Sequence, residues 1–155
     1  NEISSLYKLP IIVSTHPRTR KKMKGLTDIK INDKIKFLKP FGFFDYLQLQ
    51  KNSKCVISDS GTISEESSIL NFPAITIRNS MERPEALDTG SIIITGFDLE
   101  TIFLSIETVI KQYNSGKHFS VPSEYLIDDV SQRVLNLIIG TARLSNYWDL
   151  ISKRE

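Results

Sequence analysis

Five short apolar runs, separated by stretches with helical spacing, constrain the fold of this 155-residue chain more than any other feature. The runs are short and rich in β-branched side chains, as is typical of strands buried on both faces of a parallel sheet. The expected strands are residues 9–14, 35–38, 55–58, 74–77 and 91–95, with helices at 44–50 and 62–70 between them. This alternation predicts an α/β fold with a doubly wound parallel sheet of the Rossmann type.

The chain turns helical after the last expected strand. Asp98 is a suitable N-cap for a helix that continues to about residue 115, where Gly116 ends it. Apolar spacing predicts a second helix over 127–138, ended near Gly140, and a third within 144–151. At the other end, residues 2–8 resemble the end of a helix, so we expect a strand before them. Because the first strand of a doubly wound sheet is central, this chain alone should expose unpaired strand edges.

Composition limits which kinds of ligand and which cellular compartment the chain suits. The net charge of +2 favours neither nucleic acid nor an anionic membrane as a partner, and no apolar run approaches the roughly 18 residues of a membrane span. The single cysteine, Cys55, fits a reducing, cytoplasmic compartment and is interpreted as an inert core residue. His16 and His118 lie far apart in the sequence, so we expect no metal site, and no cofactor is predicted.

Polar side chains follow three of the expected strands. After the third strand, Ser60, Gly61 and Thr62 form a turn into a helix, an arrangement that suits a diphosphate. Glu66, one helical turn beyond Thr62, could accept both hydroxyls of a ribose. Arg83, after the fourth strand, could clamp phosphate. Each segment also has an ordinary structural interpretation: a capping turn for 58–66 and a surface loop for 78–85.

The third segment follows the first strand and contains His16 and Arg18, at the start of a basic run that extends to Lys24. A histidine at a strand end beside a nucleotide could donate a hydrogen bond or act as a general acid. The lysines of this run are more simply interpreted as a solvated helix face. Taken together, the three strand ends favour a nucleotide diphosphate as ligand.

These motifs resemble those of a known family. DSGTISEES at 59–67, FP at 72–73, Arg78 followed by ERPE at 82–85, STHPRTR at 14–20 and FDYLQL at 44–49 are similar to the non-hydrolysing UDP-N-acetylglucosamine 2-epimerases of bacteria. The similarity is greatest to the branch in capsule and O-antigen synthesis, which includes UDP-N-acetyl-L-fucosamine-type synthases. It implies a glycosyltransferase-B-like fold of two Rossmann-like domains, of which this chain resembles the second, C-terminal half with its C-terminal helices.

The resemblance also implies roles and boundaries. Residues 1–140 would form the UDP-binding domain, and 141–155 a helical tail that crosses to the first domain. Ser60, Gly61 and Arg83 match diphosphate-binding positions, and Glu66 matches the ribose-binding carboxylate. Thr62 replaces a usual glycine, so only its backbone contact carries over. The remaining matched positions are Phe41 and Tyr46 around the uracil, and His16, with Arg18 near it, where some relatives bind a regulatory UDP-sugar.

The family's reaction inverts C2 of the sugar by anti elimination of UDP through a glycal-like intermediate, followed by re-addition of UDP. Most of its acid–base carboxylates belong to the first domain, so we expect no catalytic residue in this chain and no turnover by it alone. The resemblance further implies a homodimer of the full-length enzyme. Other possible interpretations are a glycosyltransferase-B-type transferase domain, a non-catalytic nucleotide-sugar sensor, and a purely structural α/β domain.

Overall fold

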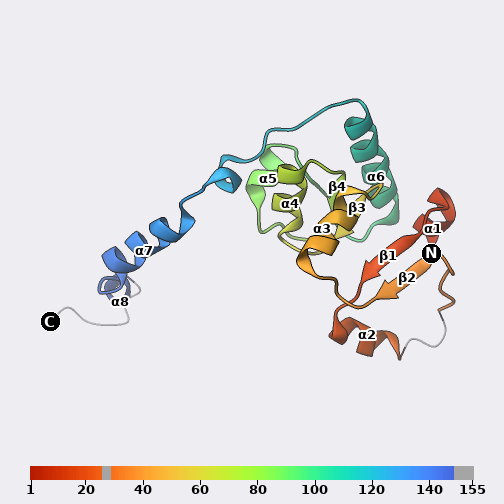
Figure 1. The fold of residues 1–155 in the computed structure, drawn as a ribbon, viewed down its shortest axis with the longest axis horizontal. Helices are drawn as coiled ribbons and strands as arrows, with labels where there is room; N and C mark the ends of the chain where they lie inside the picture. Colours follow the sequence, from red (N-terminus) through yellow and green to blue (C-terminus); the bar gives the residue numbers. More distant parts are fainter. Residues whose placement is uncertain (26–28, 149–155) are drawn as a thin grey trace. The chain divides into compact units, whose positions relative to one another are not determined.

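The computed structural model describes residues 1–25 and 29–148, without the side chains of residues 146 and 147. The chain forms two compact units, Asn1–Ser120 and Val121–Glu155. The first unit holds all the strands of the described residues (Figure 1). They are β1 (Ile11–Ser14), β2 (Ile35–Leu38), β3 (Val56–Ser58), β4 (Ala74–Thr76) and β5 (Ile93–Ile94). The five predicted strands are thus confirmed, each within about two residues of its expected bounds.

The strands form two parallel sheets. β1 pairs with β2, with Ile11 opposite Ile35, and β4 lies between β3 and β5, with Ile75 opposite both Ile57 and Ile93. Within the described residues, no ladder joins β1 to β3, so each of these strands has one unpaired edge. This is the exposure of strand edges that the sequence predicts.

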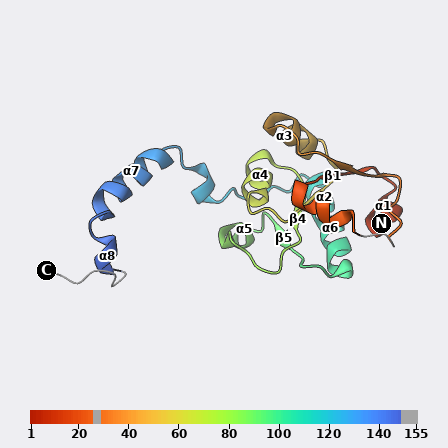
Figure 2. The same ribbon diagram turned by 90° about the horizontal axis from the view of Figure 1, so that it is seen from below.

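Strands and helices alternate along the chain, as in other α/β folds. α1 (Glu2–Tyr7) precedes β1, and each of the five strands is followed by a helix. These helices are α2 (Pro17–Met23), α3 (Phe43–Lys51), α4 (Ile63–Leu70), α5 (Pro84–Asp88) and α6 (Leu99–Asn114). Figure 2 shows β4 and β5 between α4 and α6. No helix in the described part of the chain is long and apolar enough to cross a membrane.

The core of the first unit forms where α6 packs on the sheet. Ile75 of β4 is completely buried and contacts Ile102 and Ile106 of α6. Partly buried apolar side chains surround them, including Ile3, Tyr7, Cys55, Ile93 and Val109. Every residue of β4 is buried, which explains why its run in the sequence is apolar on both faces. β4 therefore anchors the loops that follow β3 and β4.

The ends of α6 agree with the sequence. Asp98 caps the helix, because its carboxylate accepts the Thr101 amide at 2.8 Å. Gly116 follows the C-cap with φ 73°, and the amides of Gly116 and Lys117 return to carbonyls in the last turn. This is the Schellman arrangement, in which glycine is favoured.

The second unit contains a short 3-10 helix, η1 (Ser123–Leu126), α7 (Val130–Thr141) and α8 (Ser145–Trp148). The prediction that this helix ends near Gly140 is confirmed, because α7 ends at Thr141, one residue beyond it. Gly140 itself does not have the left-handed backbone of a glycine that ends a helix, since its φ is not positive. The predicted third helix is α8 as far as Trp148, and its residues 149–151 lie outside the described residues.

Candidate nucleotide-diphosphate site

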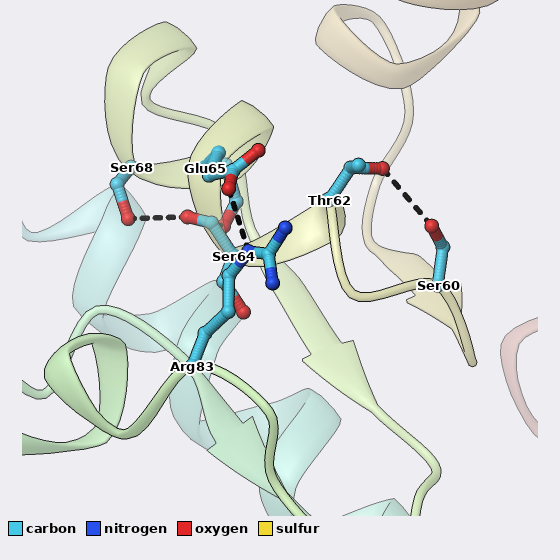
Figure 3. Close-up of polar contacts among 7 residues, drawn as sticks. Ser60, Thr62, Ser64, Glu65, Ser68 and Arg83 are labelled. Atoms are coloured by element: carbon cyan, nitrogen blue, oxygen red, sulfur yellow. Dashed lines mark hydrogen bonds and ion pairs between the residues drawn. The ribbon is translucent and has the colours of Figure 1, made fainter. Parts of the chain in front are cut away.

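The turn after β3 brings predicted site residues together. Ser58 ends β3, and its hydroxyl accepts the amide of Ser60 at 3.0 Å. The Ser60 and Thr62 hydroxyls lie 2.9 Å apart and hydrogen-bond to each other (Figure 3). Thr62 is the N-cap of α4, yet its side chain makes no capping bond to the helix. The Thr62 side chain therefore does not cap α4, as the capping-turn interpretation of this segment would require.

Amides at this turn remain available to a ligand. Among the hydrogen bonds of residues 1–25 and 29–148, the amides of Gly61 and Thr62 have no acceptor. Unpaired amides just before the first turn of a helix, together with the helix dipole, attract an anion. Hydroxyls and amides at this turn therefore suit phosphate oxygens.

Two arginines flank the same turn from the segment that follows β4. The position where a Cβ on Gly61 would lie is 3.6 Å from Nη1 of Arg83 and 3.7 Å from Nη1 of Arg78. Oε2 of Glu82 is only 3.0 Å from that position. The absence of a side chain at Gly61 therefore lets the Glu82 carboxylate and the two guanidinium groups approach the turn closely.

Carboxylates hold both arginines. Arg83 donates from Nε to Oε1 of Glu65 at 2.6 Å, as Figure 3 shows, and Arg78 donates from Nη2 to Oε1 of Glu82 at 2.5 Å. The Arg78 bond lowers the pKa of the Glu82 carboxyl below its usual range, so Glu82 is ionised at neutral pH. Sequence reasoning assigned no role to Arg78, Glu82 or Glu65. The position of Arg78 directly after a strand was the available signal for it.

Glu66 lies on another side of α4 from Glu65. Its Oε2 accepts a hydrogen bond from Nε2 of Gln50 on α3 at 2.6 Å. Tyr46 is also near: burial raises the pKa of its hydroxyl, and the charges of Glu66 and Asp59 raise that pKa further. The structure therefore brings Tyr46, Glu66 and the turn after β3 into one neighbourhood.

Phe41 and Tyr46, the predicted uracil-side residues, also lie together. Their rings are nearly parallel, with an interplanar angle of 15° and centroids 6.5 Å apart. Flat aromatic faces of this kind are suitable surfaces for a base. The adjacent Phe43 and Phe44 form a second, edge-to-face pair that is strongly exposed.

His16 and Arg18 lie at the start of α2, after β1. His16 is the exposed N-cap of α2, and its Nδ1 accepts the amide of Arg18 at 3.3 Å. Within the described ranges, no hydrogen bond or ion pair joins either residue to the turn at Gly61. The lysines of α2 are exposed, as a solvated helix face requires. No group of three or more metal-ligating side chains is found in the part of the chain that the structure describes.

Comparison with known proteins identifies the family. Residues 1–139 match the sequence profile described as UDP-N-acetylglucosamine 2-epimerase. The chain belongs to the UDP-N-acetylglucosamine 2-epimerase family. It is 42% identical over 143 residues to UDP-N-acetylglucosamine 2-epimerase of Methanococcus maripaludis, a match that covers 90% of this chain and 38% of that protein.

Solved structures agree with this family assignment. UDP-N-acetylglucosamine 2-epimerase from Rickettsia bellii superposes with a TM-score of 0.78 at 38% identity, covering 94% of this chain and 40% of that one. The Methanocaldococcus jannaschii enzyme, solved in complex with UDP-GlcNAc and UDP, gives a TM-score of 0.75 at 33% identity, covering 89% and 38%. The predicted α/β fold, glycosyltransferase-B-like in its relatives, is confirmed. The chain spans about two fifths of the length of these relatives.

Proposed function

We propose that this chain is the UDP-binding half of a UDP-N-acetylhexosamine 2-epimerase. The single observation that carries the proposal is the turn at Gly61, where amides without a described acceptor lie beside the guanidinium groups of Arg78 and Arg83, with the exposed Glu82 carboxylate bound to Arg78. Membership of the epimerase family supports it, as does the relative from Methanocaldococcus jannaschii in complex with UDP-GlcNAc and UDP.

Each residue has a role in this proposal. The amides and hydroxyls of Ser60, Gly61 and Thr62 bind the diphosphate together with Arg83. Glu66 accepts the ribose hydroxyls, and Phe41 and Tyr46 flank the uracil. When the bond between the sugar C1 and the diphosphate oxygen breaks, negative charge grows on the departing UDP. Donors that are already in place stabilise that charge without reorganising.

The proposal for the whole reaction is inversion at C2. A base removes the C2 proton as UDP departs on the opposite face, a glycal-like intermediate forms, and UDP adds back after the proton returns to the other face of C2. The enzyme would work as a homodimer in the cytoplasm, and its product would enter capsular or O-antigen polysaccharide synthesis. His16 and Arg18 would lie near a regulatory UDP-sugar.

Calorimetric titration of the purified protein with UDP tests the binding step. We expect saturable binding, and we expect Glu66→Ala to weaken it by about 1–3 kcal/mol, the usual cost of losing hydrogen bonds to a charged group. Glu107→Ala, an exposed glutamate on α6, is the matched control and should bind UDP as the wild type does. No heat of binding at millimolar UDP would contradict the proposal. Interconversion of epimers by the full-length enzyme without any acceptor distinguishes it from a transferase.

A further inference from the structure

Gln50 is a buried amide whose only described side-chain partner is Glu66. It lies near the end of α3, and only 3% of its surface is exposed. Its Nε2 donates to Oε2 of Glu66 at 2.6 Å, across sixteen residues of sequence. A hydrogen bond of this length to a carboxylate is charge-assisted and stronger than one between neutral groups.

The other end of the same amide has no partner. Oε1 of Gln50 is buried and accepts no hydrogen bond from any described residue. Burying an unsatisfied carbonyl costs about 1–3 kcal/mol, a cost that an apolar side chain of similar length would avoid. The Glu66 bond also fixes the orientation of the amide, because the reverse orientation would place a carbonyl oxygen against a carboxylate. An amide at this position is therefore explained by its donor and not by packing.

The donor restricts the Glu66 carboxylate. With Oε2 held from α3, the side chain of Glu66 keeps a fixed direction, and Oε1 remains for a further donor. Glu66 itself is only half-buried, so a ligand can approach it. A carboxylate that is already oriented loses less conformational entropy when it binds a hydroxyl than a freely rotating one.

We propose that Gln50 is a positioning residue that sets the ribose selectivity of this site. It holds Glu66 so that the carboxylate accepts the 2′-hydroxyl of a ribonucleotide, and the site therefore favours UDP over 2′-deoxy-UDP. The inference rests on the proposed function, because it needs Glu66 to face the ribose. Gln50 itself does not contact the nucleotide.

The test compares UDP with 2′-deoxy-UDP by calorimetry, for the wild type and for Gln50→Met. Methionine keeps the length and volume of the side chain and removes the donor. We expect the preference for UDP to fall by about threefold or more, the usual effect of losing part of one charge-assisted hydrogen bond, with the affinity for 2′-deoxy-UDP unchanged. The thermal midpoint should stay equal or rise, since the unpaired Oε1 is gone. Equal weakening of both ligands, or an unchanged preference, would overturn the proposal.

Gln48→Met is the matched control, because Gln48 lies on the same helix and is exposed. It should keep the full preference for UDP. If Gln48→Met lowers the preference as much as Gln50→Met, the effect belongs to α3 as a whole and the proposal fails.

Gln50→Glu gives an independent measurement, which also serves if Gln50→Met does not fold. Two carboxylates at this distance cannot both ionise readily, so they must share a proton. When the pair holds a proton, that proton replaces the hydrogen-bond donor of Gln50, whereas two ionised carboxylates repel each other. The preference of Gln50→Glu for UDP over 2′-deoxy-UDP should therefore be present at low pH and disappear as pH rises. The titration of the phosphates cancels in this ratio. A preference independent of pH would overturn the proposal.

Binding measurements distinguish a failure of the proposed function from a failure of the role of Gln50. If the wild type binds no UDP, both the proposed function and the role of Gln50 fail. If the wild type prefers UDP and Glu66→Ala removes that preference, but Gln50→Met keeps it, the proposed function stands and the role of Gln50 is overturned.

Discussion

Arg83 and Glu65 are held together at the first turn of α4, with Nε of the guanidinium 2.6 Å from Oε1 of the carboxylate. Their side chains are 30% and 35% exposed, so the pair is partly screened by solvent. Such a pair is worth about 0–1 kcal/mol, which a multiply charged diphosphate can offset. Glu65 binds Nε, and Nη1 of the same guanidinium lies 3.6 Å from the position of a Cβ on Gly61.

The planar fork of Arg83 should be specific for phosphate. Arg83→Lys keeps the charge and loses the second donor, so UDP affinity should fall by about 1–2 kcal/mol while uridine affinity stays nearly constant. Titration with both ligands measures the difference. Arg133→Lys is the matched control, because Arg133 donates from Nε to Asp129 at 2.8 Å in α7 and should affect neither ligand. Equal losses for UDP and uridine would show that Arg83 does not act on phosphate.

Gly61 should matter for binding and little for folding. A methyl group here would meet Oε2 of Glu82 at 3.0 Å, but that side chain is 57% exposed and can move. Gly61→Ala should therefore leave the free energy of unfolding within about 1 kcal/mol of the wild type. UDP affinity should fall by about 1–3 kcal/mol, because the methyl occupies the space assigned to phosphate.

Denaturant unfolding and UDP titration of the same samples separate these two effects of Gly61→Ala. Gly140→Ala provides the control, since nothing lies within 4 Å of its added Cβ and it lies inside α7. It should stabilise the protein by about 0.5–1 kcal/mol and leave UDP binding unchanged. UDP binding by Gly61→Ala equal to that of the wild type would contradict the assignment of Gly61.

His16 should contribute to the stability of α2. Its Nδ1 accepts the Arg18 amide, so His16→Ala should destabilise the protein by about 0.5–1 kcal/mol, and His16→Asn, which can still cap, by less. Denaturant unfolding measures both changes. UDP affinity should stay constant, because no described contact joins His16 to the turn at Gly61. A fall in UDP affinity with unchanged stability would instead give His16 a binding role.

The sequence predicted those parts of the fold that depend on local pattern. The apolar runs marked all five strands, although only β4 is buried at every position, and Ile12 of β1, Leu38 of β2 and Ile57 of β3 are exposed. Asp98 and Gly116 mark the ends of α6 through their own side-chain and backbone preferences. The helix end predicted near Gly140 is likewise confirmed, because α7 ends one residue later, at Thr141.

The candidate site was predictable only where a motif carried it. Ser60, Gly61 and Glu66 could be predicted because their spacing is fixed along the turn after β3 and α4, and Arg83 because it lies in the segment after the next strand, β4. Gln50 was missed, because its bond to Glu66 joins two helices and has no signature in the sequence. Adjacent glutamates on α4 likewise gave no sign that one binds Arg83 and the other Gln50, which requires the packing of α3 and α5 against α4.

Cys55 should be unreactive in the folded protein. Its side chain packs against the core around Ile75, and burial raises the pKa of its thiol to about 12. Because the thiolate is the nucleophile, a disulfide reagent at pH 8 should label Cys55 slowly in the native protein and rapidly in denaturant. The raised pKa also makes stability depend on pH. Above about 8.5, where the thiol of the unfolded chain ionises, the unfolded state binds fewer protons than the native state.

Folding stability should therefore be complete below that pH and fall as pH rises toward 12, by up to about 1.4 kcal/mol per pH unit from this group. Comparing the free energies of unfolding of the wild type and Cys55→Ala at pH 7.5 and pH 10 measures this contribution, together with the part of the raised Tyr7 pKa that comes from the Cys55 charge. The wild type should lose more stability than Cys55→Ala between these pH values. Equal losses, together with rapid labelling of the native protein, would show that the thiol is accessible and that its pKa is not raised.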